Sequence, residues 1–323
     1  MCQPIQKQAA LSAIHTRTQR LWDTLAAGQR EYGVRLLELP GGTQVLDTCR
    51  EAGSWEAGRL VTQLSQGGLS TASLALVQLE ELCLPQITVD TRAPAAACLD
   101  MQMAVPLGSA LLSGPIRLFL EPLRFVEGDI PLAQATGAMT AVVEQEQAPT
   151  PALARELAQA ARVHPGQLRI VWVRMGSVVG NTQIAGRVVE NVVLTVGRSL
   201  ELDPTRIAGV MGCAPICPCY RPGEGALLPD DFTHYTAQAY VSWLGGGEDI
   251  QALARGLCFR SAYCYGQLFS TLLARAGGAF WNIPDITHIN KLSRVTVNDL
   301  ATGRLACAGR PEPQRLARHL IPT

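Results

Sequence analysis

Arg187 and Glu190 are the residues whose types and spacing could do chemistry. They stand three positions apart in TQIAGRVVENVVLTVGRSL, whose apolar residues recur at helical spacing, so both side chains are expected on one face of a helix. Gln183, one turn earlier, extends this polar stripe. A guanidinium beside a carboxylate sets the position and the pKa of that carboxylate, which suits a group that moves protons. The alternative is a solvated ion pair worth a few tenths of a kcal/mol.

A glycine-bearing loop leads into this predicted helix. The β-branched and aromatic run LRIVWVR (168–174) predicts a strand, and GSVVGN follows it. A helix that begins there presents unpaired N–H groups and the positive end of its dipole. The glycine spacing matches neither the dinucleotide fingerprint nor the P-loop. Two interpretations stay open: a nucleotide- or anion-binding turn, or a turn that needs glycine for close packing.

Three of the ten cysteines cluster in GCAPICPCY, as Cys213, Cys217 and Cys219. This spacing raises the hypothesis of a zinc or iron–sulfur site. Two prolines separate the sulfurs, however, and no CxxC or HxxxH partner occurs elsewhere. We therefore expect a buried loop with incidental thiols and no metal. The five histidines are scattered and predict no catalytic triad.

The elements that must position these residues follow from periodicity and turn signals. Amphipathic or apolar runs predict helices near residues 1–25, 93–104, 151–163, 182–200, 251–257 and 266–278. Hairpins are predicted at 34–49 and 293–309, and strands at 87–91, 168–174 and 232–244. Strands and helices mix without a strict βαβα rhythm, which favours an α+β fold. At this length we expect two lobes with a cleft between them, one made of residues 1–95 with 292–323 and the other of residues 96–291.

Composition excludes several classes of protein. The 323 residues carry 27 basic and 27 acidic side chains, so the basic excess typical of a nucleic-acid-binding protein is missing. No run of 18 uncharged apolar residues predicts a membrane span, and the first residues lack the apolar core of a signal peptide. We expect a soluble cytoplasmic protein with no nucleic-acid or membrane partner.

Five sequence blocks together resemble the methenyltetrahydromethanopterin cyclohydrolase family. They are CLPQITVDT, SGPIR, GSVVGNTQIAGRVVE, GCAPICP and SRVTVNDLATG, and they span nearly the whole chain in this order. The resemblance implies reversible hydrolysis of the methenyl bridge of 5,10-methenyltetrahydromethanopterin to the 5-formyl compound. It also implies a two-lobed α+β protomer that binds the pterin in its cleft, a homotrimer, and no metal or redox cofactor.

The same resemblance implies roles for individual residues. Arg187 and Glu190 of the R-V-V-E element correspond to the catalytic pair of the family. The SGP-x-R element places Ser113, Gly114 and Arg117 among the substrate-binding residues, and Gln183 joins them. Because the chain is neutral and rich in arginine, it looks like the bacterial, methylotroph-type branch. In that branch the pathway is one-carbon metabolism that oxidises formaldehyde to formate.

Overall fold

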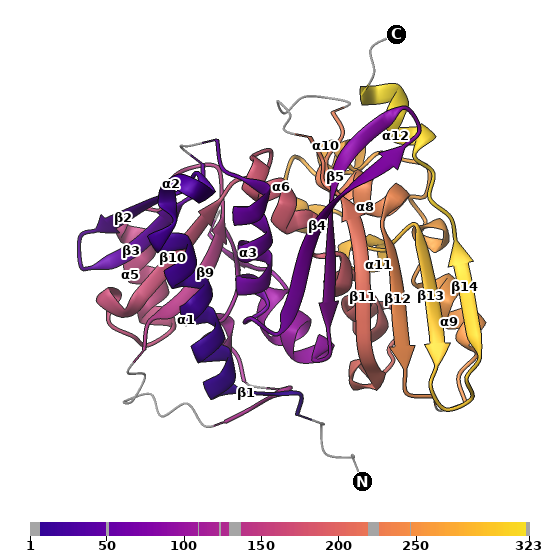
Figure 1. Cartoon of the computed structure of the whole chain (residues 1–323), viewed down its shortest axis with the longest axis horizontal. Coiled ribbons are helices and arrows are strands. Elements are labelled where there is room, and N and C mark those ends of the chain that lie inside the picture. Colours follow the sequence, from indigo (N-terminus) through magenta and orange to yellow (C-terminus); the bar gives the residue numbers. More distant parts are fainter. Residues whose placement is uncertain are drawn as a thin grey trace. The chain divides into compact units, whose positions relative to one another are not determined.

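The computed structural model describes residues 7–49, 52–108, 110–122, 124–128, 137–218, 226–245 and 247–320. The chain divides into two compact units. Unit 1 comprises Met1–Thr71 and Ala95–Gln183, and unit 2 comprises Ala72–Pro94 and Ile184–Thr323. Each unit contains a six-stranded mixed sheet and several helices (Figure 1). The α+β fold expected from the sequence is thereby confirmed.

The sheet of unit 1 is parallel at its centre and antiparallel at its edges. Its order is β2-β3-β10-β9-β7-β6, in which β10 pairs parallel with both β3 and β9. The hairpins β2–β3 and β6–β7 form its two ends. The strands are β1 (Ala9–Ala10), β2 (Arg35–Leu39), β3 (Thr43–Asp47), β6 (Val105–Leu107), β7 (Ala110–Ser113), β8 (Val126–Glu127), β9 (Met139–Glu144) and β10 (Leu168–Val173), with β1 and β8 forming a separate pair.

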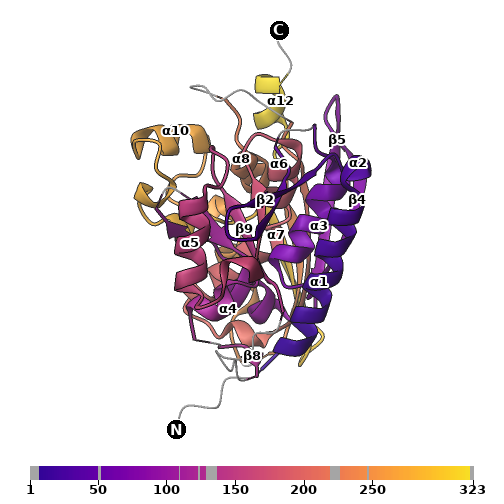
Figure 2. The same ribbon diagram turned by 90° about the vertical axis from the view of Figure 1, so that its left-hand side faces the viewer.

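Helices cover both faces of this sheet, as the alternation along β10 requires. Val171 and Val173 lie in a core with residues of α1 and α3, whereas Ile170 and Trp172 lie in a core with residues of α5. Figure 2 shows α1 and α3 on one side of β9 and α5 on the other. The helical elements are α1 (Leu11–Ala27), α2 (Gln29–Tyr32), α3 (Trp55–Ser65), a π-helical turn (Ala96–Gln102), α4 (Arg117–Leu120), α5 (Pro151–Ala160), a 3-10 turn (Pro165–Gln167) and α6 (Val178–Ala185).

The sheet of unit 2 has the order β14-β13-β12-β11-β5-β4. Only the β12–β13 pair is described as parallel, whereas β5–β11, β11–β12 and β13–β14 are antiparallel. Its strands are β4 (Ser70–Leu79), β5 (Leu82–Thr91), β11 (Ile207–Pro215), β12 (Gln238–Trp243), β13 (Arg294–Asp299) and β14 (Leu305–Gly309). Its helices are α7 (Val188–Leu194), α8 (Pro229–Thr236), α9 (Ile250–Gly256), α10 (Phe269–Arg275), α11 (Ile286–Ile289) and α12 (Gln314–Leu320). Short turns lie at Thr195–Ser199 (π-helical), Pro204–Arg206, Phe259–Ser261 and Phe280–Asn282.

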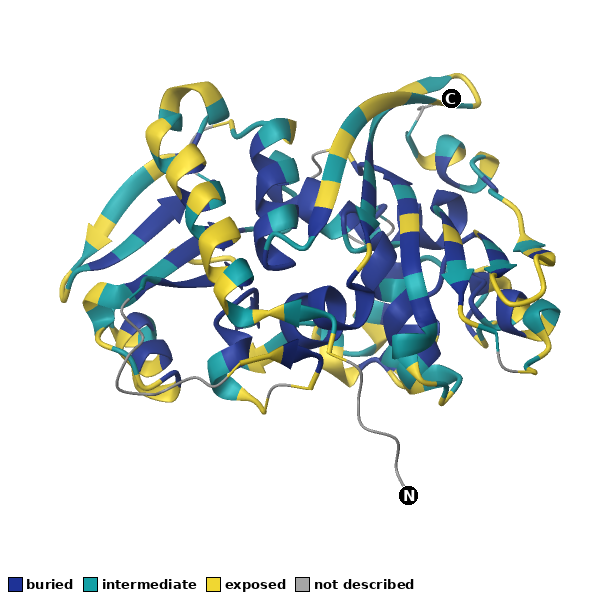
Figure 3. Cartoon of the chain, turned by 60° about the horizontal axis from the view of Figure 1, so that its bottom comes forward, coloured by how far each residue is buried: buried dark blue, intermediate teal, exposed yellow. Residues whose placement is uncertain are grey.

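One face of this second sheet is open. Helix α7 packs on β11 and β12, and α9 packs on β13 and β14. On the opposite face, cross-strand neighbours form a row that is exposed or half-buried, made of Asp90, Met211, Tyr240, Thr296 and Cys307. Exposed and half-buried residues also dominate the β4–β5 hairpin (Figure 3). Such alternation is typical of an antiparallel sheet with one solvated face.

Three expectations need correction. Residues 232–244 do not form one strand, because Pro229–Thr236 is helix α8 and only Gln238–Trp243 is a strand. The segment 229–231 reads Pro-Asp-Asp, and Pro229 at the first helical position with Asp231 accepting the N–H of Leu228 starts a helix there. The predicted helix over 182–200 is interrupted, since α6 ends at Ala185 and α7 begins at Val188.

The two units also differ from the lobes expected at 1–95 with 292–323, and 96–291. The C-terminal hairpin β13–β14 pairs with β12 of its own half of the chain. The hairpin β4–β5 leaves the N-terminal half and pairs with β11. Over the described ranges, no helix is long and apolar enough to cross a membrane.

Candidate active site

The carboxyl ends of β3 and β9, the two strands that pair in parallel with β10, bring acidic side chains to one edge of the unit 1 sheet. In register, Asp47 of β3 lies opposite Trp172 of β10, and Glu144 of β9 lies opposite Val173. Asp47 is fully buried, and its Oδ1 accepts the N–H of Cys49 at 2.8 Å. Burial, together with the charge of Asp47, raises the pKa of the Cys49 thiol to about 11. Cys49 is therefore a neutral thiol at this edge and not a thiolate nucleophile.

The loop that follows β10 caps α6 with its own side chains. Ser177 Oγ accepts the N–H of Gly180 at 3.0 Å, and Asn181 Oδ1 accepts the N–H of Gly176 at 2.8 Å. Gly180 must be glycine, because a Cβ there would lie 2.0 Å from the carbonyl oxygen of Arg174. Two N–H groups at this turn are thus satisfied within the loop. Gly180 allows the backbone of α6 to lie close to the carbonyl of Arg174, as the interpretation of the turn as a packing feature predicts.

Gln183 is fully buried in α6 and contacts a carboxylate from a distant strand. Its Nε2 donates to Glu144 Oε2 at 2.9 Å, although 39 positions separate the two residues. Its Oε1 has no hydrogen-bond partner among the described residues. A buried amide oxygen without a partner is costly and is a natural acceptor for a ligand N–H or a water.

Glu144 is the residue that sequence reasoning missed. In the sequence Glu144 opens the polar stretch EQEQAPTP, but in the structure it is the last residue of β9. The available signal was its place directly after the apolar run MTAVV, since an acidic residue at the carboxyl end of a parallel strand often faces a ligand site. Without knowing that β9 and β10 pair in parallel, this signal could not be used.

Arg187 and Glu190 form a buried ion pair in unit 2. Arg187 Nη1 donates to Glu190 Oε2 at 2.7 Å, and the two side chains are only 15% and 6% exposed. Arg187 is the residue before the first turn of α7, with φ −77° and ψ 2°, and Glu190 lies within that turn. The interruption of the helix at residues 186–187 therefore preserves the i,i+3 contact. Because the pair is buried, the solvated surface pair considered above is wrong.

The start of α7 is held against the sheet by close packing. A Cβ at Gly212 of β11 would lie 2.9 Å from Val188 Cγ2, so the missing side chain lets α7 approach the strand. The valines Val188, Val189, Val192 and Val193 are all buried. This packing orders the backbone that carries Arg187 and Glu190. A carboxylate in the first turn of a helix is also stabilised by the helix dipole.

The SGP-x-R residues lie within unit 1. Ser113 ends β7, and Gly114 follows with φ +92°, donating its N–H to the carbonyl of Met101 at 2.9 Å. Arg117 is 1% exposed, and its guanidinium donates to the carbonyl of Leu99 at 2.8 Å and to Glu121 at 2.5 Å. Arg117 thus connects α4 to the π-helical turn. Arg117 therefore has a structural role in addition to the contact with substrate that the sequence predicts.

Two members of the cysteine cluster are described, and Cys219 lies outside the described residues. Cys213 is half-buried on β11, and burial raises the pKa of its thiol. Cys217 is buried beyond the end of that strand, with its Sγ 3.4 Å from the carbonyl oxygen of Pro218. In the part of the chain that the structure describes, no group of three His, Cys, Asp or Glu side chains is placed to hold a metal ion.

Comparison with known proteins follows this geometry. The family model described as Cyclohydrolase (MCH) matches residues 13–320. A protein of Methanocaldococcus jannaschii is 26% identical over 326 residues, covering 95% of this chain and 98% of its own. Proteins of Methanococcus vannielii and Methanospirillum hungatei are each 28% identical, covering 90% and 91% of this chain and 92% and 94% of their own. All three relatives are named methenyltetrahydromethanopterin cyclohydrolase.

Proposed function

The chain belongs to the cyclohydrolase family MCH, and from this premise we propose that it hydrolyses 5,10-methenyltetrahydromethanopterin to 5-formyltetrahydromethanopterin, reversibly. Family membership makes the protein a cyclohydrolase, a hydrolase that opens a cyclic carbon–nitrogen bond. The choice of pterin is supported by the names of relatives that align with almost the whole chain. The observation that carries the mechanism is the buried Arg187–Glu190 pair, whose Nη1–Oε2 distance is 2.7 Å.

The chemistry needs few groups. The bridge carbon of a methenyl pterin belongs to an amidinium-like cation, so it is already electrophilic and needs no metal as Lewis acid. Glu190 removes a proton from the attacking water as the C–O bond forms, and returns it to the leaving nitrogen as the C–N bond breaks, so one carboxylate serves as base and then as acid. The hydroxyl proton of the intermediate is released to solvent as the formyl C=O forms. Its negative charge also stabilises the cationic bridge. We accordingly propose that the enzyme uses no metal and no redox cofactor.

Arg187 is the positioning partner of Glu190. Its guanidinium donates to Oε2 of the carboxylate and thereby fixes the orientation of the Glu190 side chain. Removing this donor would let the Glu190 side chain take up other rotamers and lose the orientation that the reaction requires. Gln183, with an acceptor oxygen that lacks a hydrogen-bond partner among the described residues, is proposed to bind a pterin N–H group. Ser113, Gly114 and Arg117 stay proposed substrate-binding residues.

A nucleotide- or anion-binding role for the GSVVGN turn is not favoured. Such a role needs free N–H groups at the start of the helix. Here Ser177 and Asn181 accept the N–H groups of Gly180 and Gly176. The turn therefore serves to pack the helix.

We also propose that the enzyme acts in the cytoplasm, in bacterial, methylotroph-type one-carbon metabolism that oxidises formaldehyde to formate. The neutral charge balance, 27 basic against 27 acidic residues, supports this branch assignment. Deleting the gene in the source organism should then abolish growth on methanol while growth on a multicarbon substrate persists. Unchanged growth on methanol would count against this pathway and leave the cyclohydrolase activity itself untouched.

Assembly as a homotrimer is part of the proposal. The open face of the unit 2 sheet supports it, because Met211 and Tyr240 are cross-strand neighbours that are 50% and 42% exposed. Light scattering at micromolar protein should give three times the chain mass of 34.6 kDa. A monomer mass would refute this assembly.

The direct test is to mix purified protein with methenyltetrahydromethanopterin and follow the loss of its near-ultraviolet absorption. Methenyltetrahydrofolate, run beside it, tests the choice of pterin. We expect rapid hydrolysis of the first compound and little of the second. A wild-type protein that accelerates neither reaction would overturn the proposed function.

A further inference from the structure

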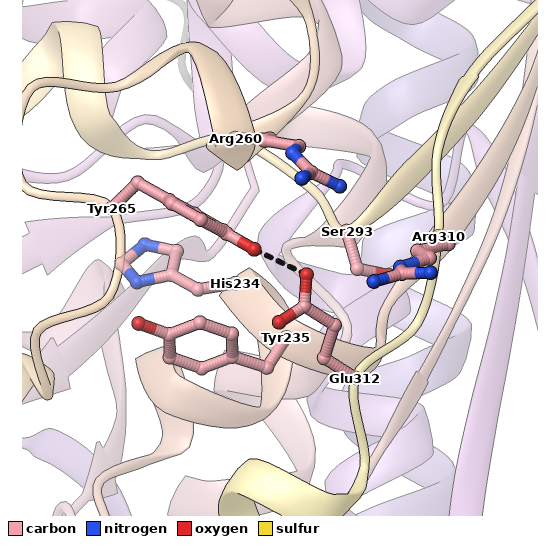
Figure 4. A pocket seen from close by; sticks show the side chains of 7 residues that line it. All are labelled: His234, Tyr235, Arg260, Tyr265, Ser293, Arg310 and Glu312. Atoms are coloured by element: carbon pink, nitrogen blue, oxygen red, sulfur yellow. Dashed lines mark hydrogen bonds between the residues drawn. The ribbon is translucent and has the colours of Figure 1, made fainter.

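A small pocket in unit 2 lies apart from the residues used above. It is lined by His234, Tyr235, Arg260, Tyr265, Ser293, Arg310 and Glu312. These residues come from α8, the turn Phe259–Ser261 and its following loop, and the segments that flank β13 and β14. Figure 4 shows the guanidinium groups of Arg260 and Arg310 beside the carboxylate of Glu312 and near Ser293. Since every lining residue belongs to unit 2, the pocket is complete within that unit.

The one carboxylate that lines the pocket, Glu312, already has a positively charged partner. Glu312 is only 6% exposed, and Arg315 Nε donates to its Oε2 at 2.5 Å. The hydroxyl of Tyr265 donates to its Oε1 (Figure 4). Burial raises the pKa of Glu312, but these two donors and the charges of Arg315 and Arg310 outweigh it and hold the pKa below its usual value. Glu312 is therefore a charged anchor that orders Tyr265 and Arg315.

The remaining charges of the pocket are positive. No ion pair joins Arg260 or Arg310 to a carboxylate among the described residues. Arg260 lies 5.8 Å from the centre of the Tyr265 ring, a contact that holds it over the pocket without cancelling its charge. Arg310 also acts electrostatically on Glu312. Counted together, Arg260, Arg310, Arg315 and Glu312 carry a net charge of +2.

A buried histidine adds an unused polar atom to the wall. His234 is 2% exposed and stacks on Phe259, with ring centres 4.0 Å apart. Its Nδ1 has no hydrogen-bond partner within the described ranges. Complete burial lowers the pKa of His234 to about 3, so the ring is neutral and contributes a hydrogen-bonding site without charge. A buried polar atom on the wall of a pocket indicates a partner that is a ligand or a water.

We propose that this pocket binds the phosphate group of a small soluble phosphate monoester, held by the guanidinium groups of Arg260 and Arg310. Arginine presents paired N–H donors that match phosphate oxygens, and two arginines balance a phosphate dianion. The space free of protein atoms is about 210 Å³, part of it open to solvent. The enclosed volume itself is only about 10 Å³. The phosphate group is therefore bound at the open mouth of the pocket, where Arg260 and Arg310 are exposed, with the rest of the ligand outside.

The test is calorimetric titration of the full chain at constant ionic strength, with inorganic phosphate and glycerol 3-phosphate as probes. We expect saturable binding of both by the wild-type protein. Arg260→Ala and Arg310→Ala should each weaken it by roughly tenfold, as expected for the loss of one charged contact, and the double variant should abolish it. Arg304→Ala removes the same charge from an exposed turn that does not line the pocket, so it should bind like wild type.

Several results would overturn the proposal. They are the absence of saturable binding to wild type, unchanged binding in the double variant, and an equal loss in Arg304→Ala, which would indicate general charge attraction. Binding confined to vesicles that contain phosphatidic acid would also refute it, because the ligand would then be a lipid headgroup. Circular dichroism must show that each variant is folded; Arg260→Gln or Arg310→Gln replaces any Ala variant that is not. Binding without turnover keeps this test separate from the proposed cyclohydrolase activity.

Discussion

Replacing Glu190 by glutamine tests whether the buried pair is catalytic or only structural. The side chain of Glu190 is 6% exposed, and its Oε2 lies 2.7 Å from Arg187 Nη1. Glutamine keeps an oxygen that can accept from the guanidinium and keeps the shape of the side chain. It removes the negative charge and the ability to take a proton.

The two interpretations predict different magnitudes. Loss of a charged hydrogen bond in Glu190→Gln should lower the free energy of unfolding by about 1–3 kcal/mol. Glu190→Ala takes the carboxylate away from a buried guanidinium altogether and should lower it by about 3–5 kcal/mol. A positioned general acid–base contributes roughly 10²- to 10⁴-fold to the rate, so kcat of the Gln variant should fall by that range. Arg187→Ala acts on the same carboxylate, and the double variant should therefore be little slower than the slower single variant.

The assay is the loss of methenyl absorption, measured at a temperature where circular dichroism shows every variant folded. Glu56→Gln is the matched control, because Glu56 and Arg59 have the same i,i+3 spacing in α3 but the Glu56 side chain is 45% exposed. It should change stability by less than about 1 kcal/mol and leave kcat unchanged.

A Glu190→Gln enzyme with wild-type kcat would refute the reasoning and remove Glu190 from the mechanism. A control variant that lost activity in the same proportion would show that the assay reports stability and not chemistry.

Three further predictions follow from the geometry. Arg117→Met should lower the free energy of unfolding by about 1–3 kcal/mol because the buried carbonyl of Leu99 loses its donor, and a simultaneous rise in KM would show that Arg117 also binds substrate. Burial lowers the pKa of His234 to about 3, so below about pH 6.5 the unfolded chain binds a proton that the folded chain does not. Stability should therefore fall as the pH drops from about 6.5 toward 3, and urea unfolding of His234→Phe should lack this loss of about 1.4 kcal/mol per pH unit. Asp231, whose pKa burial raises to about 6, acts in the opposite sense between about pH 4 and 6, so wild type and variant must be compared at each pH. Finally, dialysis against EDTA should leave kcat unchanged, and a loss of activity that zinc restores would revive the hypothesis of a metal at the cysteine cluster.

The sequence by itself determined the features that depend on neighbours along the chain. Both hairpins, β10 and helix α5 follow from turn residues and periodicity. The contact between Arg187 and Glu190 also follows from sequence, because residues three apart meet at a helix start whether or not the preceding helix continues. Even the interruption at residues 186–187 left this contact intact.

Tertiary structure decided whether these residues are surrounded by water. The side chains of Arg187 and Glu190 are only 15% and 6% exposed. Helix α7, which carries Glu190, packs on β11 at Gly212, a contact between segments more than 20 positions apart. The bond from Gln183 to Glu144 spans 39 positions and depends on β9 pairing in parallel with β10. Likewise, the division into units depends on β4–β5 pairing with β11. Strand pairing and burial depend on contacts between segments that are remote in sequence. The local periodicity of the sequence does not indicate which strands are neighbours in a sheet.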